Sequence, residues 1–336
     1  MTLHWHERTR PYKEQHRFSG WATKLTGANS MYLYLTVRSE SERQLIEAEC
    51  IAITGTAPDE NGIALAETEA DVSRAAYIKT GMKVIISASD LSELYDQLER
   101  ANICSEQFRA SVVKIPRRLP LDSKQIMHQV GARIEGNPNL SNPRTIFLVV
   151  ADQERIWLGE VLSESTRAWN EHSQKLHLYS SALPTRLARA MVNLVAAPGD
   201  RIIDPCCGSG TILIEAASIG IKAVGCDINP KLVHVSIGNL KYFNLSSLVL
   251  MADARNIKGR FDAVVTDLPY GRNCPLDGEL NREILQNLKE LAPKAAVVTC
   301  EDMSDLLLQM GYDVKRVIAV PKASLIRYIH VVHLSS

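Results

Sequence analysis

The stretch VVTDLPYGRN sets a carboxylate, a proline and an aromatic ring directly behind a short apolar run. The Asp267 carboxylate and the main-chain carbonyl of Leu268 can both accept hydrogen bonds from an amino group. Pro269 holds φ at about −65° and stiffens the chain, and the Tyr270 ring offers a face on which a flat base can stack. These residue types predict a loop that holds and orients an amine.

A second stretch, DPCCGSGTILIEAA, also follows an apolar run and leads into a helix. Gly208 and Gly210 let a ligand approach the backbone and the helix N–H groups, which indicates a nucleotide-like cofactor. The stretch lacks the third glycine of the dinucleotide fingerprint and the Gly-Lys-Ser/Thr of a P-loop, so NAD and ATP are disfavoured. Asp227, in VGCDINP, is placed to accept from both hydroxyls of a ribose, and Asp253, in MADAR, to lie near an adenine edge.

Five short apolar strands must position these residues: RIIDPCC, KAVGCDI, LVLMADA, FDAVVTDL and KAAVVTC. Because they alternate with helical sequence, they predict a parallel sheet with helices on both faces. The segment LPTRLARAMVNLVAAPGD predicts a helix just before this sheet. The chain end, YDVKRVIAV followed by LIRYIHVVHL, leaves no room for a crossover helix and predicts an antiparallel hairpin. The fold class is therefore α/β, Rossmann-like, with a mostly parallel sheet that ends in this hairpin.

The N-terminal half reads as two small α+β units behind a basic arm, residues 1–30. The first, residues 31–102, holds MYLYLTVR, SERQLIEAECIAITG, KVIISAS and DLSELYDQLERA. The second, residues 103–170, holds FRASVVKI, SKQIMHQVGARIEG, the turn NPNLSNP and the buried run TIFLVVA. The catalytic-looking domain then spans residues 171–336.

Composition bounds the class of protein. No apolar run approaches the roughly 20 residues of a membrane span, and the N-terminus has no secretory apolar region, so we predict a cytoplasmic protein with no membrane contact. The seven cysteines form no C-x-x-C pair, which predicts reduced thiols and no metal site. Net charge is zero, yet residues 109–189 carry twelve basic against seven acidic residues, a balance compatible with RNA.

Taken in order, DPCCGSGTILIEA, CDIN, ADAR and DLPY resemble an S-adenosylmethionine-dependent methyltransferase of the amino-methylating kind. The resemblance implies that Asp204 and the glycines surround the methionine part of the cofactor, Asp227 the ribose, and Asp253 with Ala254 the adenine. The full set of cofactor-binding residues that it implies is Pro184, Thr185, Asp204, Cys206, Gly208, Gly210, Asp227, Ile228, Asp253, Ala254 and Asp267.

Two further stretches resemble the tRNA guanosine N2-methyltransferases that carry a THUMP domain. SSALPTRLARAMVNL is similar to the helix that opens their catalytic domain, with Pro184 and Thr185 beside the cofactor carboxylate. GARIEGNPNLSNPRTIFLVVADQERIWLGEVL is similar to the THUMP domain, which binds RNA, and residues 31–102 would be the ferredoxin-like unit that precedes it. The basic residues expected to contact phosphates are Lys114, Arg117, Arg118, Lys124 and Arg133.

In this family the loop is usually Asp/Asn-Pro-Pro-Tyr/Phe, whereas this chain has leucine at the second place. The catalytic residues implied are Asp267, Leu268, Pro269 and Tyr270. The lone pair of an exocyclic base amine is delocalised into the ring, so the two acceptors would draw it out toward the methyl group, while Tyr270 stacks on a flipped-out base. The Leu268 carbonyl survives the change from proline, but the stiffness of the loop is placed in doubt.

The resemblance implies methyl transfer from S-adenosylmethionine to the N2 amine of a tRNA guanosine, at position 10 rather than position 6. A ribosomal RNA or DNA amino-methyltransferase of the same fold is the nearest alternative. A catalytically inactive RNA-binding protein is an alternative of another class. Some eukaryotic relatives work with a small activating protein, and the sequence leaves open whether this chain needs one and which oligomeric state it adopts.

Overall fold

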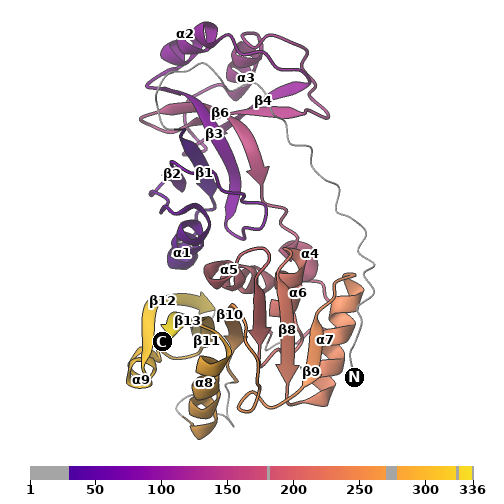
Figure 1. Ribbon diagram of the computed structural model, residues 1–336. Coiled ribbons are helices and arrows are strands. Elements are labelled where there is room, and N and C mark those ends of the chain that lie inside the picture. Colours follow the sequence, from indigo (N-terminus) through magenta and orange to yellow (C-terminus); the bar gives the residue numbers. More distant parts are fainter. Residues whose placement is uncertain (1–29, 180–181, 270–277, 323–324, 335–336) are drawn as a thin grey trace.

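The computed structural model describes residues 30–179, 182–269, 278–322 and 325–334. Figure 1 shows two lobes, one above the other, each built on its own sheet. The N-terminal lobe comprises residues 30–164 and the C-terminal lobe residues 169–334.

A single six-stranded sheet in the order β2-β1-β3-β6-β5-β4 forms the N-terminal lobe. The two predicted α+β units share this sheet, because β3 pairs antiparallel with β6 from Thr80 opposite Glu164 to Ala88 opposite Ile156. The predicted boundary at residues 102–103 falls between α2 and β4, inside the lobe. The strands are β1 (Tyr32–Thr36), β2 (Ile63–Ala66), β3 (Ile78–Ala88), β4 (Phe108–Lys114), β5 (Thr145–Ala151) and β6 (Ile156–Glu164).

Helices α2 (Leu91–Ala101) and α3 (Ser123–Gly131) cover one face of this sheet at the end far from the C-terminal lobe (Figure 1). Both begin at an aspartate whose carboxylate accepts main-chain N–H groups of the first turn, Asp90 from Glu93 at 2.9 Å and Asp122 from Lys124 at 2.8 Å. Such caps satisfy donors that have no partner within the helix. Helix α1 (Arg43–Thr54), preceded by the 3₁₀ turn η1 (Glu40–Glu42), lies at the opposite end and faces the C-terminal lobe.

The C-terminal lobe confirms the predicted fold class. Its seven-stranded sheet has the order β12-β13-β11-β10-β7-β8-β9, in which β7 to β11 are parallel neighbours and the last two strands form the antiparallel hairpin. The strands are β7 (Arg201–Asp204), β8 (Lys222–Asp227), β9 (Leu248–Met251), β10 (Ala263–Asp267), β11 (Lys294–Thr299), β12 (Tyr312–Lys322) and β13 (Leu325–Leu334).

Helices cover both faces of this sheet, as the alternating pattern predicts. One core contains apolar residues of α5 (Thr185–Val195), α6 (Thr211–Ser218) and α7 (Pro230–Tyr242), and the other those of α8 (Glu279–Leu291) and α9 (Ser304–Gln309). The short helix α4 (Trp169–His172) begins the lobe. Because β7 to β11 pair in parallel, their carboxyl ends lie at one edge of the sheet.

The two lobes meet where α1 packs against α5, and the contact is polar as well as apolar. The fully buried Glu49 carboxylate accepts from the main-chain N–H groups of Ala76 and Tyr77, at 2.8 and 2.6 Å, and from Asn193 Nδ2 of α5 at 2.7 Å. The Arg186 guanidinium lies 4.1 Å from the Tyr77 ring centroid. Of the three donors to this carboxylate, Asn193 comes from the C-terminal lobe, so the buried Glu49 links α1 to α5.

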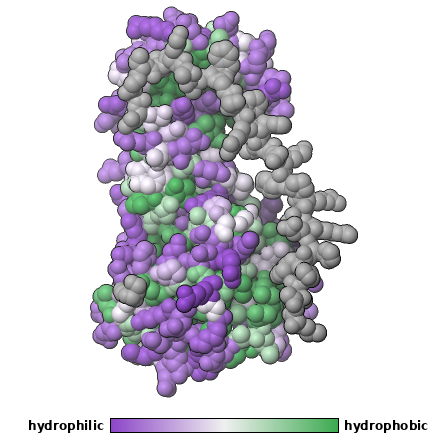
Figure 2. Space-filling view, in the orientation of Figure 1, coloured by the Kyte–Doolittle hydropathy of each residue, from purple (hydrophilic) through white to green (hydrophobic). Residues whose placement is uncertain are grey.

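Exposed apolar side chains gather on the edge strand β9 and beside it, and Figure 2 shows a hydrophobic area at the lower right, where Figure 1 places β9. The residues are Ile228, Tyr242, Leu248, Leu250 and Met251. Within the described ranges, the helices are too short or too polar to cross a membrane.

Candidate active site

The candidate site lies at the carboxyl edge of the C-terminal sheet, where the strand order reverses between β7 and β10. Asp204 ends β7, Asp227 ends β8 and Asp267 ends β10. Because β10 pairs with β7 and β7 with β8 in parallel, these three carboxylates lie at neighbouring strand ends. Such a switch point is where open α/β sheets bind ligands.

The glycine turn connects β7 to α6 and requires its glycines. Gly208 and Gly210 have φ of +51° and +81°, in the left-handed region that favours glycine. A Cβ on Gly210 would lie 2.3 Å from Ser236 Oγ of α7. At Gly208 the same position has no protein atom within 4 Å, so the turn presents its backbone to open space. The Asp227 carboxylate accepts from the Gly208 amide at 2.9 Å and from the Asn229 amide at 2.8 Å.

Asp204 lies beneath this turn and is buried. Its carboxyl accepts from Thr266 Oγ1 of β10 at 2.9 Å and from the Cys206 amide at 3.1 Å. Burial raises the pKa of Asp204 to about 8 against the effect of these two donors, and the nearby Asp267 and Asp227 carboxylates raise it further. The site therefore holds a carboxyl group that is largely protonated at neutral pH.

The loop after β10 explains how leucine replaces the usual proline. The Leu268 amide donates to the Val298 carbonyl at 3.1 Å and continues the β10–β11 ladder, and its side chain is buried in the core beneath α8. Asn281 Nδ2 of α8 lies 3.5 Å from the Pro269 carbonyl oxygen. A proline at position 268 has no N–H to donate, so here pairing and burial restrict the loop where a second proline would otherwise do so. Tyr270 lies outside the described residues.

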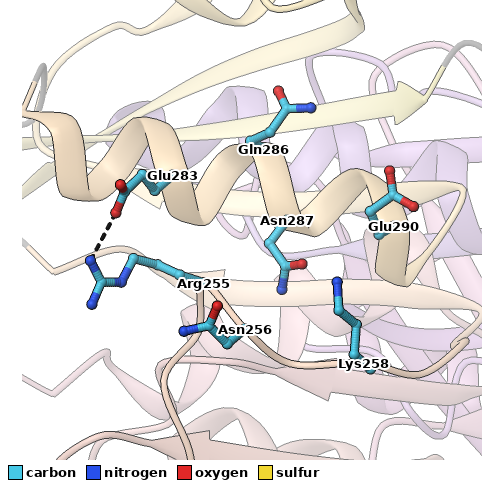
Figure 3. Close-up of a pocket in the computed structure, with 7 residues that line it drawn as sticks. All are labelled: Arg255, Asn256, Lys258, Glu283, Gln286, Asn287 and Glu290. Carbon is cyan, nitrogen blue, oxygen red and sulfur yellow. Dashed lines mark hydrogen bonds and ion pairs between the residues drawn. The ribbon is translucent and has the colours of Figure 1, made fainter.

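The predicted adenine-side residues are engaged with their own neighbours. The Asp253 carboxylate forms an ion pair with Arg255 at 2.6 Å, and Arg255 in turn binds Glu283 of α8 at 2.8 Å. Figure 3 shows this second pair at one end of a pocket of about 680 Å³, lined by Arg255, Asn256, Lys258, Glu283, Gln286, Asn287 and Glu290. The carbonyl of the buried Ala254 accepts a hydrogen bond from Asn287 Nδ2 at 2.9 Å. The hydrogen bonds from Arg255 lower the pKa of Asp253. Its carboxylate is therefore ionised, and it is bound to the Arg255 guanidinium.

The other predicted cofactor residues lie in varied surroundings. Thr185 begins α5 and its hydroxyl donates to the Trp169 carbonyl at 2.7 Å, while Pro184 is exposed as the preceding residue. Ile228 follows Asp227 and is exposed. Burial raises the pKa of the Cys206 thiol well above its usual value, so this cysteine is a packed neutral thiol rather than a nucleophile. Their contacts with the cofactor remain predictions.

The five predicted RNA contacts divide into two groups. Arg117, Arg118 and Lys124 are exposed on the N-terminal lobe. Lys114 Nζ instead donates to the Leu119 and Leu121 carbonyls at 2.9 Å, and Arg133 pairs with Glu99 at 2.9 Å and lies 4.8 Å from the Tyr95 ring centroid. Lys114 and Arg133 therefore have partners within the lobe. The prediction of phosphate binding now applies mainly to the exposed Arg117, Arg118 and Lys124.

The sequence reasoning missed the side chains that hold the glycine turn. Lys175 and Asn239 both contact the turn, and the buried Glu215 of α6 binds Arg189 at 2.7 Å and His172 at 2.8 Å. A glutamate inside the apolar helix TILIEAA is a signal that a buried partner exists. Lys175 belongs to none of the sequence motifs, so no pattern in the sequence indicates that it contacts the turn.

The arrangement suits S-adenosylmethionine. The turn offers an open backbone cradle at Gly208, the Asp227 carboxylate binds the Gly208 amide, and the buried Asp204 carboxyl lies at the end of the strand that precedes the turn. Among the residues that the structure describes, no cluster of His, Cys, Asp and Glu has the form of a metal site.

Two family models match the chain. One, described as an RMKL-like methyltransferase domain, covers residues 174–320, and the other, described as a DNA methylase, covers residues 9–238. Among solved structures, TrmN from Thermus thermophilus aligns with 91% of this chain and 100% of its own at 20% identity and a TM-score of 0.47.

Curated relatives carry more specific names. The tRNA (guanine(10)-N2)-dimethyltransferase of Methanothermobacter thermautotrophicus is 30% identical over 232 residues, which are 65% of this chain and 68% of that relative. The protein of the same name from Methanocaldococcus jannaschii is 31% identical over 230 residues, 63% of this chain and 65% of its own. The matched segments thus span about two thirds of each relative. By this similarity, the chain belongs to the tRNA (guanine(10)-N2)-dimethyltransferase family.

Proposed function

We propose that the protein methylates the N2 amine of guanosine in tRNA, at position 10. S-adenosylmethionine supplies an activated methyl group on a sulfonium centre. The relatives named above support this substrate and position. The N-terminal lobe, with the exposed Arg117, Arg118 and Lys124, is the part that we propose binds the tRNA.

One observation carries the proposal: the Asp267 loop leaves the sheet directly beside the glycine turn. Thr266, the residue before Asp267, donates to Asp204 at the base of that turn at 2.9 Å. A base amine held by the Asp267 carboxylate and the Leu268 carbonyl is thereby presented next to the cofactor cradle. The task of these residues is alignment, which is the main requirement when the leaving group is already activated.

Two acceptors at one nitrogen also explain how a weakly nucleophilic amine reacts. Hydrogen bonds to both N–H groups hold the nitrogen lone pair out of conjugation with the ring and aim it at the methyl carbon. Transfer leaves the nitrogen positively charged, and the Asp267 carboxylate stabilises that charge and can take the proton released. The Leu268 carbonyl keeps its position because the Leu268 amide is paired with Val298.

The first experiment is transfer of labelled methyl groups into bulk undermodified tRNA, followed by nucleoside analysis by mass spectrometry. We expect N2-methylguanosine or its dimethyl form. A tRNA transcript with adenosine at position 10 should take up no label, whereas adenosine at position 6 should leave uptake unchanged. Label in ribosomal RNA or DNA, and none in tRNA, would refute the tRNA substrate and retain the chemistry. Absence of S-adenosylhomocysteine binding would refute the enzyme itself.

A further inference from the structure

A short segment that begins at the last residue of α4, residues 172–177, contacts the glycine turn with a buried lysine. The Lys175 side chain is only 6% exposed. Its Nζ lies 2.5 Å from Thr211 Oγ1 and 3.4 Å from Ser209 Oγ. A buried ammonium is costly unless it is hydrogen-bonded, and the hydroxyls that it finds are those on either side of Gly210.

The ends of this segment are fixed independently. His172 Nδ1 lies 2.8 Å from Glu215 of α6, which also holds Arg189 of α5 in a fully buried ion pair. The His177 amide donates to Asn239 Oδ1 of α7 at 2.8 Å, and Asn239 Nδ2 donates to the Ser209 carbonyl at 3.0 Å. The lysine therefore stands on a segment that is anchored at both ends.

Successive residues of the turn are held by different groups. Asp227 accepts the Gly208 amide, and Lys175 with Asn239 holds Ser209 and Thr211. Between them Gly208 and Gly210 keep their positive φ angles. Without Lys175, the Ser209 and Thr211 hydroxyls lose a charged donor, and the turn can relax away from the form that receives a ligand.

We propose that Lys175 is a positioning residue of the cofactor site, which holds the Ser209 and Thr211 hydroxyls and thereby fixes the glycine turn for S-adenosylmethionine. The inference rests on the proposed function, because it takes this turn as the cofactor site. Burial lowers the pKa of Lys175 to about 8, and the nearby Glu215 acts in the opposite direction. Lys175 is therefore protonated in most molecules at neutral pH, and a charged ammonium is a strong hydrogen-bond donor to the two hydroxyls.

The test compares Lys175→Met, Lys175→Arg and the control Lys222→Met, whose lysine is exposed at the far end of β8. Calorimetry with S-adenosylhomocysteine gives the affinity, and steady-state kinetics give KM for S-adenosylmethionine and kcat separately. We expect Lys175→Met to weaken binding by about 10-fold or more, the usual scale for one charged hydrogen bond. KM should rise in parallel while kcat at saturation stays near wild type.

Lys175→Arg retains the charge and the donors and should recover most of the affinity, and Lys222→Met should bind as wild type does. If Lys175→Met fails to fold, the near-isosteric Thr211→Val removes the accepting hydroxyl and should weaken binding in the same way. Wild-type affinity in Lys175→Met, or in Thr211→Val, would overturn the inference and leave the proposed function standing. Failure of the wild-type protein to bind S-adenosylhomocysteine would instead overturn the proposed function.

Discussion

The Asp227 carboxylate accepts the Gly208 amide at 2.9 Å, so one residue both ends β8 and shapes the glycine turn. Its replacement by alanine removes an acceptor from the turn and from the ribose together. We expect Asp227→Ala to weaken S-adenosylhomocysteine binding by about 100-fold, since each charged hydrogen bond contributes on the order of 1.5–3 kcal/mol. Calorimetry measures this, with the exposed Asp96→Asn as control. Binding within threefold of wild type would refute the role of Asp227.

The buried Asp204 should make stability depend on pH. Its pKa is about 8 in the folded protein against 3.8 for the ordinary side chain. Between these values the folded state binds more protons than the unfolded state, so this group makes the free energy of unfolding fall as pH rises from about 4 to about 8. Below about pH 4 the ionisation of Asp204 costs the folded state no stability, and above about pH 8 the loss of stability has reached its full value.

Asp204→Asn keeps the shape and an accepting oxygen but cannot ionise. We expect the variant to gain stability relative to wild type by about 1–4 kcal/mol as pH rises from 4 to 8. Urea denaturation of the ligand-free protein at several pH values measures the difference, in which other titrating groups cancel. A difference that does not change across this range would show that Asp204 is ionised normally.

Asp267 should affect turnover rather than cofactor binding. In Asp267→Ala the base amine loses one of its two acceptors, and we expect kcat to fall by about 100-fold or more, the scale on which misalignment acts. Asp267→Asn keeps one accepting oxygen and should lose less. Single-turnover methyl transfer with matched calorimetry separates the two effects. A variant that binds S-adenosylhomocysteine normally and retains near-normal turnover would disprove the assignment.

The buried Glu49 should stabilise the contact between the lobes. Glu49→Ala leaves the Ala76 and Tyr77 amides and Asn193 without their common acceptor. We expect the free energy of unfolding to fall by about 3–5 kcal/mol, as is usual when one side of a buried charged network is removed. Denaturation curves test this, with Glu40→Ala, an exposed glutamate of the turn before the same helix, as control. An equal loss in the two variants would contradict a special role for the buried carboxylate.

The three exposed basic residues of the N-terminal lobe should determine the salt dependence of tRNA binding. Replacing Arg117, Arg118 and Lys124 with alanine should reduce the slope of log affinity against log salt by about 2–3, close to one unit per phosphate contact. Filter binding over a range of salt concentrations measures the slope, and Lys222→Ala is the control. The same slope in the triple variant and wild type would exclude these residues from the RNA interface.

Sequence patterns predicted the features that residues close together in the chain determine. The alternation of apolar strands and helices predicted the C-terminal sheet and its hairpin, and it placed Asp204, Asp227 and Asp267 each after a strand of that sheet. Pairing between distant segments was beyond such patterns. The β3–β6 pairing, which merges two predicted units into one sheet, depends on register between separate segments. Likewise, nothing beside Asp253 in the sequence distinguishes an arginine that binds it from one that faces solvent.

The place of β13 bears on how the molecule is made. This strand, the last that the structure describes, lies between β11 and β12 and pairs with both. Helix α1, near the start of the described chain, packs on β12, where Gln44 accepts from the Ala319 amide at 3.0 Å. Among the described strands, β12 pairs with β13. During translation, the contact between α1 and β12 therefore cannot be completed until β13 has left the ribosome and joined the sheet. A nascent chain halted before Leu325 would expose the edge of β11 and the outer face of α1 together, and both would be targets for chaperones.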